Sequence, residues 1–103
     1  MNEIEFFEDE KLTRKVTNLV YDEPTNAGET KVITIFAKNS SPNELRDIQF
    51  QSTDKEVTFD PEMIFSLQPS QSIQLKIIWK PRENRKDALK TKIYAFCKMV
   101  IRP

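Results

Sequence analysis

Four acidic residues lie close together in the middle of the chain, and they are the first candidates for chemistry. These residues are Asp54, Glu56, Asp60 and Glu62. Paired carboxyl groups can act as general acid and base, and a set of them can bind calcium. However, the glycine that a calcium loop needs at its sharp turn is absent, and no ordered series of oxygen ligands follows. The spacing therefore gives these acids neither a catalytic nor a metal-binding role.

The residue types that carry most other protein chemistry are missing. The chain has no histidine, its only cysteine is Cys97, and its only glycine is Gly28. Imidazole catalysis, a disulfide within the chain, a cysteine zinc cluster and a glycine-rich phosphate loop are thereby excluded. We predict a protein that is not an enzyme and has no cofactor, no metal and no small-molecule substrate. We interpret Cys97 as a small core or hairpin residue, although the adjacent Lys98 would lower the pKa of a reactive thiol.

Length and composition favour one folded domain. The chain has 103 residues, of which 38% are hydrophobic and 31% charged, and it carries seven Phe, two Tyr and one Trp. These aromatic residues argue against disorder. No run reaches the roughly 18 apolar residues that a membrane helix needs. Glu3 and Glu5 argue against a secretory signal peptide, because such a peptide begins with a positively charged region. We therefore expect a cytosolic chain with no signal peptide and no transmembrane segment.

Alternation of apolar and polar residues predicts β-strands along most of the chain. Residues 30–39 are apolar on both faces, which is typical of a central strand. Residues 72–80 give the clearest half-buried strand and place Trp79 in the core. Further strands are expected at residues 4–7, 15–20, 45–52, 57–59, 64–67, 89–96 and 99–101. The last of these would form a hairpin by turning near Cys97-Lys98.

Turn residues separate these runs, and no helix of useful length is expected. Seven or eight short strands predict an all-β fold with two packed antiparallel sheets, a β-sandwich. Residues 13–103 would form this domain. Residues 1–12 would be either an acidic N-terminal arm or an edge strand. At two strand ends, Asn39 is expected to bond neighbouring backbone groups and Gly28 to supply a positive φ.

The order of core and turn motifs over residues 28–96 resembles a known family. Gly28-Glu29-Thr30 leads into a strand that ends in Lys38-Asn39-Ser40, and Ile48, Phe50, Val57, Phe59 and Pro61 follow. The turn Leu67-Gln68-Pro69-Ser70-Gln71-Ser72 then precedes a strand that ends in Trp79-Lys80-Pro81. This pattern resembles the immunoglobulin-like domains of the major sperm protein and the ASPM/SPD/hydin (ASH) group. It departs from them at Ser70, where the family has glycine, and at Lys80, which separates the aromatic residue from the proline.

The resemblance implies an immunoglobulin-like antiparallel β-sandwich. The chain is also similar in overall style to immunoglobulin-like modules of bacteriophage virion structural proteins. Within the major-sperm-protein group, some domains bind acidic, phenylalanine-containing peptides on a basic sheet face. The resemblance therefore offers an interaction function and implies no catalytic residues.

Charge is unevenly distributed although the net charge is zero. Residues 1–75 carry 7 Lys and Arg against 14 Asp and Glu, a net charge of −7, and residues 76–103 carry 9 against 2, a net charge of +7. Seven bases on two strands and their connecting loop form the main candidate partner-binding site. They are Lys76, Lys80, Arg82, Arg85, Lys86, Lys90 and Lys92. This basic face would bind an acidic protein, nucleic acid or a lipid headgroup, or be a solvated surface that blocks edge aggregation.

A second candidate site lies in the N-terminal arm, at Phe6, Phe7, Glu8 and Asp9. The two phenylalanines would either pack at a sheet edge or anchor the chain in a neighbouring subunit, with the acids as a polar rim. Both candidate sites favour binding to other proteins over chemistry.

We therefore predict a non-enzymatic structural or interaction module, a small accessory subunit that decorates or bridges a larger assembly such as a bacteriophage virion. One alternative is an adaptor like the major sperm protein, with acidic peptides on its basic face. The other is a nucleic-acid-binding accessory protein, which the zero net charge disfavours. The expected partners are other protein subunits, and the expected location is the virion or the host cytoplasm.

Overall fold

Eight β-strands make up the fold of the computed structural model, which describes residues 3–16, 18–21, 26–82 and 89–100. The strands are β1 (Ile4–Phe7), β2 (Asn18–Tyr21), β3 (Lys31–Asn39), β4 (Leu45–Ser52), β5 (Val57–Asp60), β6 (Met63–Leu67), β7 (Ser72–Trp79) and β8 (Leu89–Met99). No helix occurs among the described residues. The predicted all-β class is confirmed.

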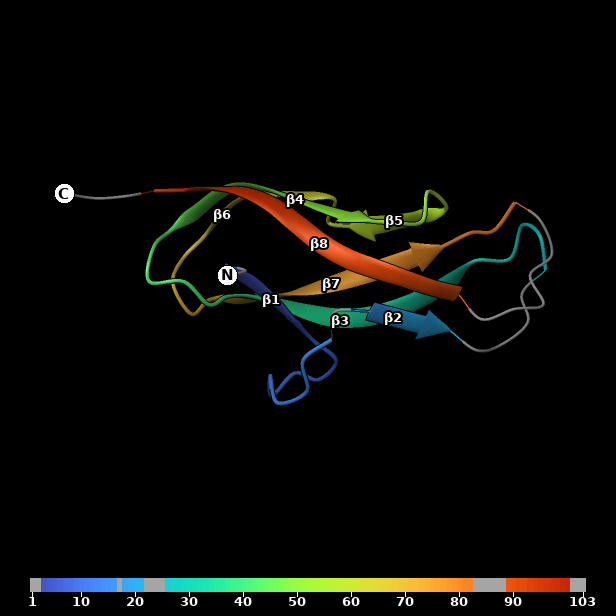
Figure 1. Cartoon of the computed structure of the whole chain (residues 1–103), viewed down its shortest axis with the longest axis horizontal. Helices are drawn as coiled ribbons and strands as arrows, with labels where there is room; N and C mark the ends of the chain where they lie inside the picture. Colours follow the sequence, from blue (N-terminus) through green and yellow to red (C-terminus); the bar gives the residue numbers. More distant parts are fainter. Residues whose placement is uncertain (1–2, 17, 22–25, 83–88, 101–103) are drawn as a thin grey trace.

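The strands form two antiparallel sheets that face each other, as the predicted sandwich requires (Figure 1). The first, here called sheet I, has the order β1-β3-β7-β5, and the second, sheet II, has the order β2-β8-β4-β6. The predicted central position of residues 30–39 is confirmed, because β3 lies between β1 and β7. The molecule is elongated along the strands and measures 52 × 25 × 20 Å.

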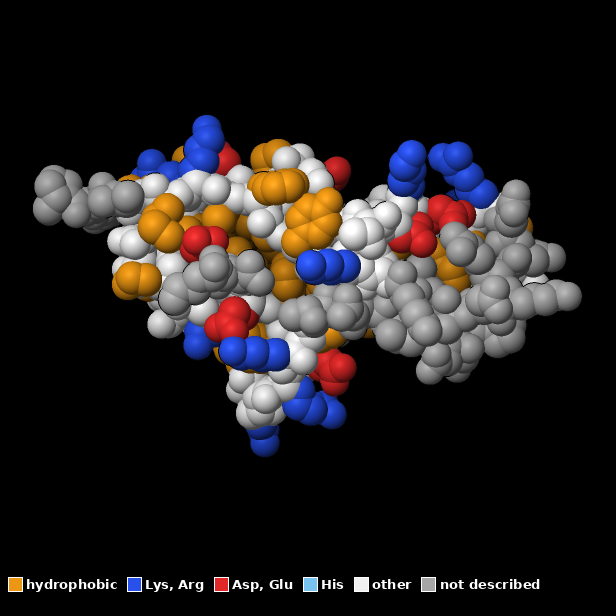
Figure 2. Space-filling model, in the orientation of Figure 1, with side chains coloured by type: hydrophobic (Ala, Val, Ile, Leu, Met, Phe, Trp, Pro, Cys, Tyr) orange, Lys and Arg blue, Asp and Glu red, His pale blue; other side chains and the backbone are white. Residues whose placement is uncertain are grey.

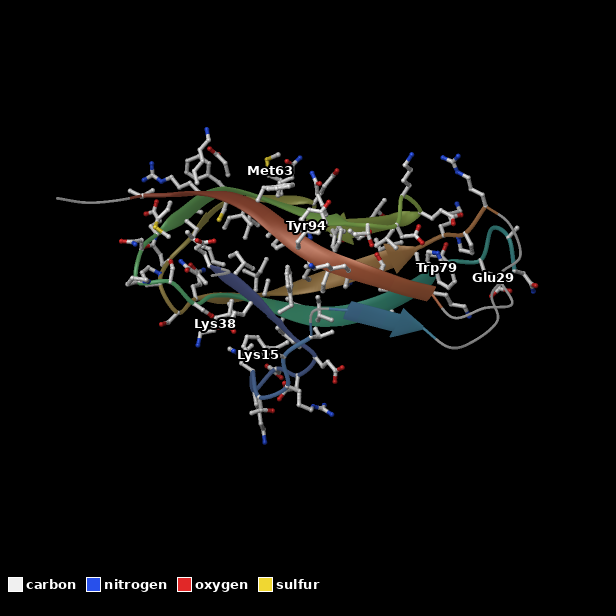
Figure 3. All side chains as sticks on the ribbon, in the orientation of Figure 1. Lys15, Glu29, Lys38, Met63, Trp79 and Tyr94 are labelled. Atoms are coloured by element: carbon white, nitrogen blue, oxygen red, sulfur yellow. The ribbon has the colours of Figure 1, made fainter. Side chains whose placement is uncertain are left out.

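The core fills the space between the sheets. Trp79, labelled in Figure 3, is 1% exposed. Ile77 is fully buried, as its position two residues earlier on β7 predicts. Phe50 of β4 packs between two other rings, and its centroid is 6.2 Å from that of Phe6 and 6.2 Å from that of Phe59. These contacts join β1, β4 and β5, so both sheets share one apolar core.

The N-terminal residues belong to the sandwich. Residues Ile4–Phe7 pair with β3, with Phe6 opposite Ala37, and form an edge strand of sheet I. The side chains of Phe6 and Phe7 are 6% and 5% exposed. Edge packing, one of the two interpretations of the phenylalanine pair, is therefore what the structure has. Phe6 belongs to the core cluster between the sheets, whereas Phe7 is buried but does not belong to that cluster. A role of this pair in binding a neighbouring subunit stays a prediction.

The C-terminal hairpin predicted near Cys97-Lys98 does not form. Strand β8 continues to Met99, because β4 pairs with it on both sides of a register shift between Arg46 and Gln49. Leu45 lies opposite Met99 and Arg46 opposite Lys98. The sequence alone suggested a turn in this segment, but pairing with β4 keeps it extended.

Single residues fix several strand ends. Gly28 has a φ of 83°, as predicted. Ser70, which stands where the resembled family has glycine, has a φ of 67° in the left-handed region. Asn39 is fully buried, and its Nδ2 donates to the carbonyl oxygens of Asn43 at 2.7 Å and Leu67 at 2.9 Å. The predicted role of Asn39 at a strand end is confirmed, and it extends to a strand of the other sheet.

Candidate functional site

The sandwich separates the predicted basic residues. Lys76 is exposed on β7 of sheet I, where it lies opposite Thr34 of β3 and Asp60 of β5. Lys92 is exposed on β8 of sheet II. Outward positions of two packed sheets face in opposite directions, so these two lysines do not share a surface. The sequence placed them together because their strands are neighbours along the chain.

The other members of the basic set lie near the ends of β7 and β8. The backbone N–H of Lys80 donates to the Glu56 carbonyl oxygen at 3.3 Å, and that of Arg82 donates to the Glu56 carboxylate. Lys90 pairs through its backbone with Val20 of β2. Arg85 and Lys86 lie outside the described residues, and so does the side chain of Lys90. Their role in binding a partner stays a prediction.

The acids of the N-terminal arm contact their own loop. The Asp9 carboxylate accepts hydrogen bonds from the backbone N–H of Thr13 at 3.0 Å and of Arg14 at 2.9 Å. It also accepts one from the Thr13 hydroxyl, and these bonds lower the pKa of Asp9 to about 2. Glu8 is exposed and lies 4.0 Å from the Arg14 guanidinium. Asp9 therefore stabilises the turn that follows β1, and a role in partner binding stays a prediction.

The central acids also have structural partners. The backbone N–H of Glu56 donates to the Asp54 carboxylate at 2.8 Å, which forms the turn before β5. Among the described residues, no three histidine, cysteine or acidic side chains are close enough to share a metal ion. Nothing in this part of the chain adds a catalytic role to these acids.

The Cys97 thiol lies on the inner face of sheet II and is half-buried. Burial raises its pKa, and the nearby Glu3 carboxylate raises it further. The interpretation of Cys97 as a residue packed in the core region is confirmed, and its pKa is raised rather than lowered, contrary to the rival interpretation based on Lys98. Successive residues of a strand point to opposite faces, so the Lys98 ammonium lies on the exposed side of β8.

An exposed apolar surface, which the sequence analysis missed, covers the outer face of sheet II. Met63 and Phe65 of β6 are 57% and 74% exposed, and Phe96 of β8 is 56% exposed. Gln49 of β4 lies opposite both Met63 and Phe96 in the strand register, so these side chains form a row across the sheet. Tyr94 stacks edge-on against Phe96, with their centroids 5.4 Å apart. We call Met63, Phe65, Tyr94 and Phe96 the outer patch; Figure 3 labels Met63 and Tyr94.

Charged side chains surround the outer patch, and two of its three bases are already paired with acids, Arg46 with Glu44 and Lys98 with Asp47. The Arg46 guanidinium carbon lies 5.9 Å from the centroid of the Phe65 ring. Lys92 and Lys98 extend from the same face of β8 as Tyr94 and Phe96, and the Lys98 ammonium is 3.5 Å from the Asp47 carboxylate. The alternation that predicts Lys92 as outward also predicts Tyr94 and Phe96 as outward. The sequence therefore contained the signal for the β8 part of the outer patch. It did not show that Met63 and Phe65 of β6 lie on the same face.

Comparison of the chain with protein-family models, with curated proteins and with solved structures found no match. None of the described segments is a helix long and apolar enough to cross a membrane.

Proposed function

We propose that the chain is a non-enzymatic interaction module, a small accessory subunit that decorates or bridges a larger protein assembly. The outer patch is the observation that carries this proposal. Three of its side chains expose more than half of their surface. Exposed apolar groups gathered on one face typically mark protein–protein contacts, and aromatic residues, methionine and arginine are enriched in such contacts.

The surroundings of the outer patch bear on the kind of partner that we propose. Arg46, Lys92 and Lys98 lie around the apolar side chains; Arg46 is paired with Glu44 and Lys98 with Asp47. A complementary surface would offer apolar pockets for Phe65 and Phe96 and acidic groups at the rim. A subunit of a protein lattice fits this description, and a virion is our favoured setting because the sequence is similar in overall style to phage virion modules.

An adaptor that binds acidic, phenylalanine-containing peptides is the second candidate. The observation that favours it is the combination of exposed aromatic rings with Lys92 and Lys98 on one sheet face. In both candidates the same surface binds an acidic protein partner. They differ in whether the partner is a folded lattice or a short peptide.

Assembly with the outer patch removed tests the proposal. A tagged chain is expressed in its native cell, and the fraction that co-sediments with large assemblies is measured for wild type, for Phe65→Ser/Phe96→Ser, and for Val32→Ser. Val32 is a matched control because it is an apolar residue 54% exposed on sheet I, the opposite sheet. We expect the double variant to be lost from the assemblies and the control to remain.

All three proteins should unfold at the same urea concentration, because none of these side chains is buried. Equal retention of the double variant and the control in the assemblies would contradict the proposal. If the wild-type chain binds a synthetic acidic peptide but does not co-sediment with any assembly, the adaptor is favoured.

A further inference from the structure

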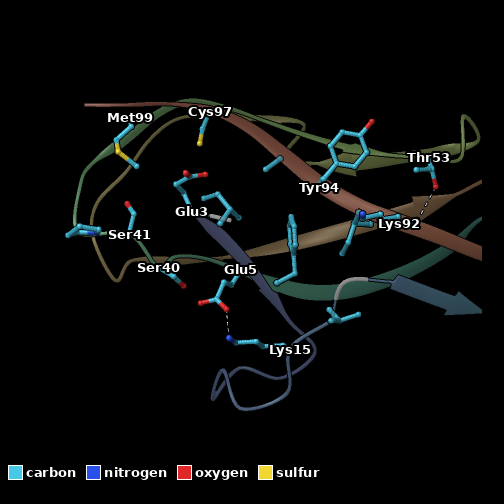
Figure 4. Close-up of a pocket in the computed structure, with 16 residues that line it drawn as sticks. Glu3, Glu5, Lys15, Ser40, Ser41, Thr53, Lys92, Tyr94, Cys97 and Met99 are labelled. Carbon is cyan, nitrogen blue, oxygen red and sulfur yellow. Dashed lines mark hydrogen bonds and ion pairs between the residues drawn. The ribbon is translucent and has the colours of Figure 1, made fainter. Parts of the chain in front are cut away.

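A groove opens between the two sheets, at the side where β1 of sheet I faces β8 of sheet II (Figure 4). Its volume is about 840 Å³. Ile4 and Phe6 line one wall, and Ile93, Ala95 and Cys97 line the other. Apolar side chains are visible in this recess in the space-filling view (Figure 2). The groove meets the outer patch at Tyr94, which lines both, whereas Met63, Phe65 and Phe96 do not line the groove.

One edge of β8 is open along this groove. Strand β2 pairs with β8 only from Leu89 to Lys92. On the other edge, β4 pairs with residues 93–96, 98 and 99, with a register shift opposite Cys97. Within the described residues, no strand pairs with Ile93–Met99 on the groove side.

The direction of the backbone groups follows from two hydrogen bonds at the ends of this stretch. The Lys92 carbonyl oxygen accepts from the Thr53 N–H at 3.0 Å, and the Val100 N–H donates to the Glu44 carbonyl oxygen at 2.9 Å. Both bonds point away from the groove. Because backbone groups alternate sides along a strand, those of the intervening odd-numbered residues point into it. These residues are Ile93, Ala95, Cys97 and Met99.

Part of the wall opposite β8 is already paired. The loop that follows β1 occupies its free edge from Phe6 to Glu8: the Val16 N–H donates to the Phe6 carbonyl oxygen at 2.8 Å. The Glu8 N–H likewise donates to the Arg14 carbonyl oxygen at 2.9 Å. An open strand edge beside an apolar hollow is a template for pairing with another strand.

We propose that an extended segment of a partner protein binds along Ile93–Met99 and adds a strand to sheet II. Its backbone would pair with the open edge of β8, and its alternate side chains, small and apolar, would enter the groove. The groove has a volume of about 840 Å³, which is room for several such side chains. In this binding mode the backbone gives affinity and the pockets for alternate side chains give specificity.

Charge at the two ends of the groove specifies the partner further. Glu3 lies beside Cys97 at one end, and Lys92 lies beside Tyr94 at the other (Figure 4). Neither forms an ion pair with another described residue. A complementary segment carries a basic residue at the Glu3 end and an acidic residue at the Lys92 end. In an antiparallel arrangement, its N-terminal end is the basic one.

A second copy of this chain does not fit the groove as well. Pairing of two β8 edges would satisfy their backbones, but the inward side chains of β8 are already part of the core. Ile93, for example, is 4% exposed. A second copy would therefore bring no free apolar side chains to the groove. The occupant must be a segment whose side chains are unused in its own fold.

Cys97 gives a direct readout, since it lines the groove and is the only cysteine of the chain. The probe is the synthetic peptide KVTVTATVE, acetylated and amidated, and the measurement is the rate at which Cys97 reacts with a disulfide reagent. We expect saturating peptide to slow this reaction by about tenfold, because strand addition covers the groove. The charge-reversed peptide EVTVTATVK should bind more weakly.

A peptide N-methylated on the backbone groups that face β8 is the matched control, and it should give no protection. Amide hydrogen exchange at Ala95 and Cys97 should slow with the first peptide only. The Ala95→Arg variant, with a long cation in the groove, should lose the protection; its folding is checked by urea unfolding. If that variant does not fold, the N-methylated peptide still tests the pairing.

Three results would overturn the proposal: no protection by the unmodified peptide at millimolar concentration, equal protection by the N-methylated peptide, or concentration-dependent protection without peptide. The last would identify a second copy as the occupant. The inference does not depend on the proposed function. The outer-patch variant Phe65→Ser/Phe96→Ser should bind the peptide normally, so the two proposals fail separately.

Discussion

At the scale of single residues, buried and hydrogen-bonded side chains hold the strand ends of this sandwich. The amide of Asn39 illustrates this, because its Oδ1 accepts from the Ser41 N–H at 2.9 Å while its Nδ2 bonds two carbonyl oxygens. Buried backbone groups need such partners, since an unpaired one costs about 1–3 kcal/mol. Polar residues in the core here fix the turns, while apolar residues supply most of the stability.

Trp79→Ala tests the core assignment. Trp79 is 1% exposed. Its truncation leaves a large cavity and should lower the free energy of unfolding by about 3–5 kcal/mol. Urea unfolding measures this change, with Phe65→Ala as the control, because Phe65 is 74% exposed. A Trp79→Ala midpoint equal to that of the parent would place this residue on the surface.

Ser70→Gly should stabilise the protein. Ser70 has a φ of 67°, and a left-handed conformation costs a residue with a Cβ about 1–2 kcal/mol. Glycine removes this strain but has more freedom in the unfolded chain, so the expected net gain is about 0.5–1 kcal/mol. Thermal unfolding checks it. A lower melting temperature for Ser70→Gly would show that the hydroxyl side chain outweighs the backbone strain.

Asp9 should titrate at unusually low pH. Hydrogen bonds from Thr13 and Arg14 to its carboxylate lower its pKa from 3.8 to about 2. Because this pKa is lowered in the folded protein, the ionised carboxylate stabilises the fold at any pH above the unfolded-state pKa of 3.8. That stabilisation is lost as the pH falls from 3.8 toward about 2. An NMR titration of the carboxyl carbon measures the midpoint. Thr13→Val, which removes the hydroxyl donor, should raise it; an ordinary pKa in the wild type would refute the hydrogen-bonded loop.

At the scale of elements, pairing and register decide which surfaces remain open. Strand β1 is an edge strand of sheet I and pairs with β3. Strand β2 pairs with only the first part of β8, so the rest of that edge of β8 is open in the described part of the chain. On the other side of sheet II, the edge strand β6 presents Met63 and Phe65 to solvent. Open edges and exposed apolar side chains are features that soluble proteins usually avoid, so both favour partners for sheet II.

Removal of residues 1–7 should unfold the domain. Ile4, Phe6 and Phe7 are each at most 6% exposed. Burial of each such side chain contributes about 1.5–3 kcal/mol, so the sum approaches the 5–15 kcal/mol that typically stabilises a whole domain. Circular dichroism of the truncated chain should show lost β-structure. The control Glu3→Gln/Glu5→Gln keeps the strand and should change stability by less than about 1 kcal/mol, since exposed ion pairs contribute little. A folded truncated chain would make residues 1–7 an independent arm.

At the scale of the whole molecule, folding mixes the charges that the sequence separates. The acidic first part and the basic last part of the chain meet in pairs such as Lys98 with Asp47. Other ion pairs form within the N-terminal part, for example between Lys15 and Glu5. Lys76 lies opposite Asp60 in the strand register. The described surface therefore presents no continuous basic stripe of the kind that a nucleic acid requires.

Binding to a random oligonucleotide should be negligible at physiological salt. The net charge is zero, and acids interrupt the described bases on both sheets. A nucleic-acid-binding protein would show an affinity whose logarithm falls linearly with the logarithm of salt concentration. A salt titration followed by fluorescence anisotropy distinguishes the two cases. Micromolar binding that weakens when Lys80 or Lys92 is replaced by alanine would favour the nucleic-acid alternative.

The sequence by itself determined the strands and most of the core. Alternation over two residues is a local property, so it predicted that Ile77 and Trp79 point inward and that β3 is central. The types of Asn39 and Gly28 also determined their roles, because few residues satisfy a buried strand end or adopt a positive φ without strain. The non-enzymatic prediction comes from composition alone.

Only the tertiary structure decided which strands share a sheet, and hence which side chains share a surface. Lys76 and Lys92 lie on opposite faces because β7 and β8 belong to different sheets, although they follow each other in the chain. Phe96 and Met63 share a row because β4 pairs with both β8 and β6. The open edge of β8 exists because β2 ends its pairing at Lys92. Each of these features depends on contacts between residues far apart in the sequence, which local periodicity does not encode.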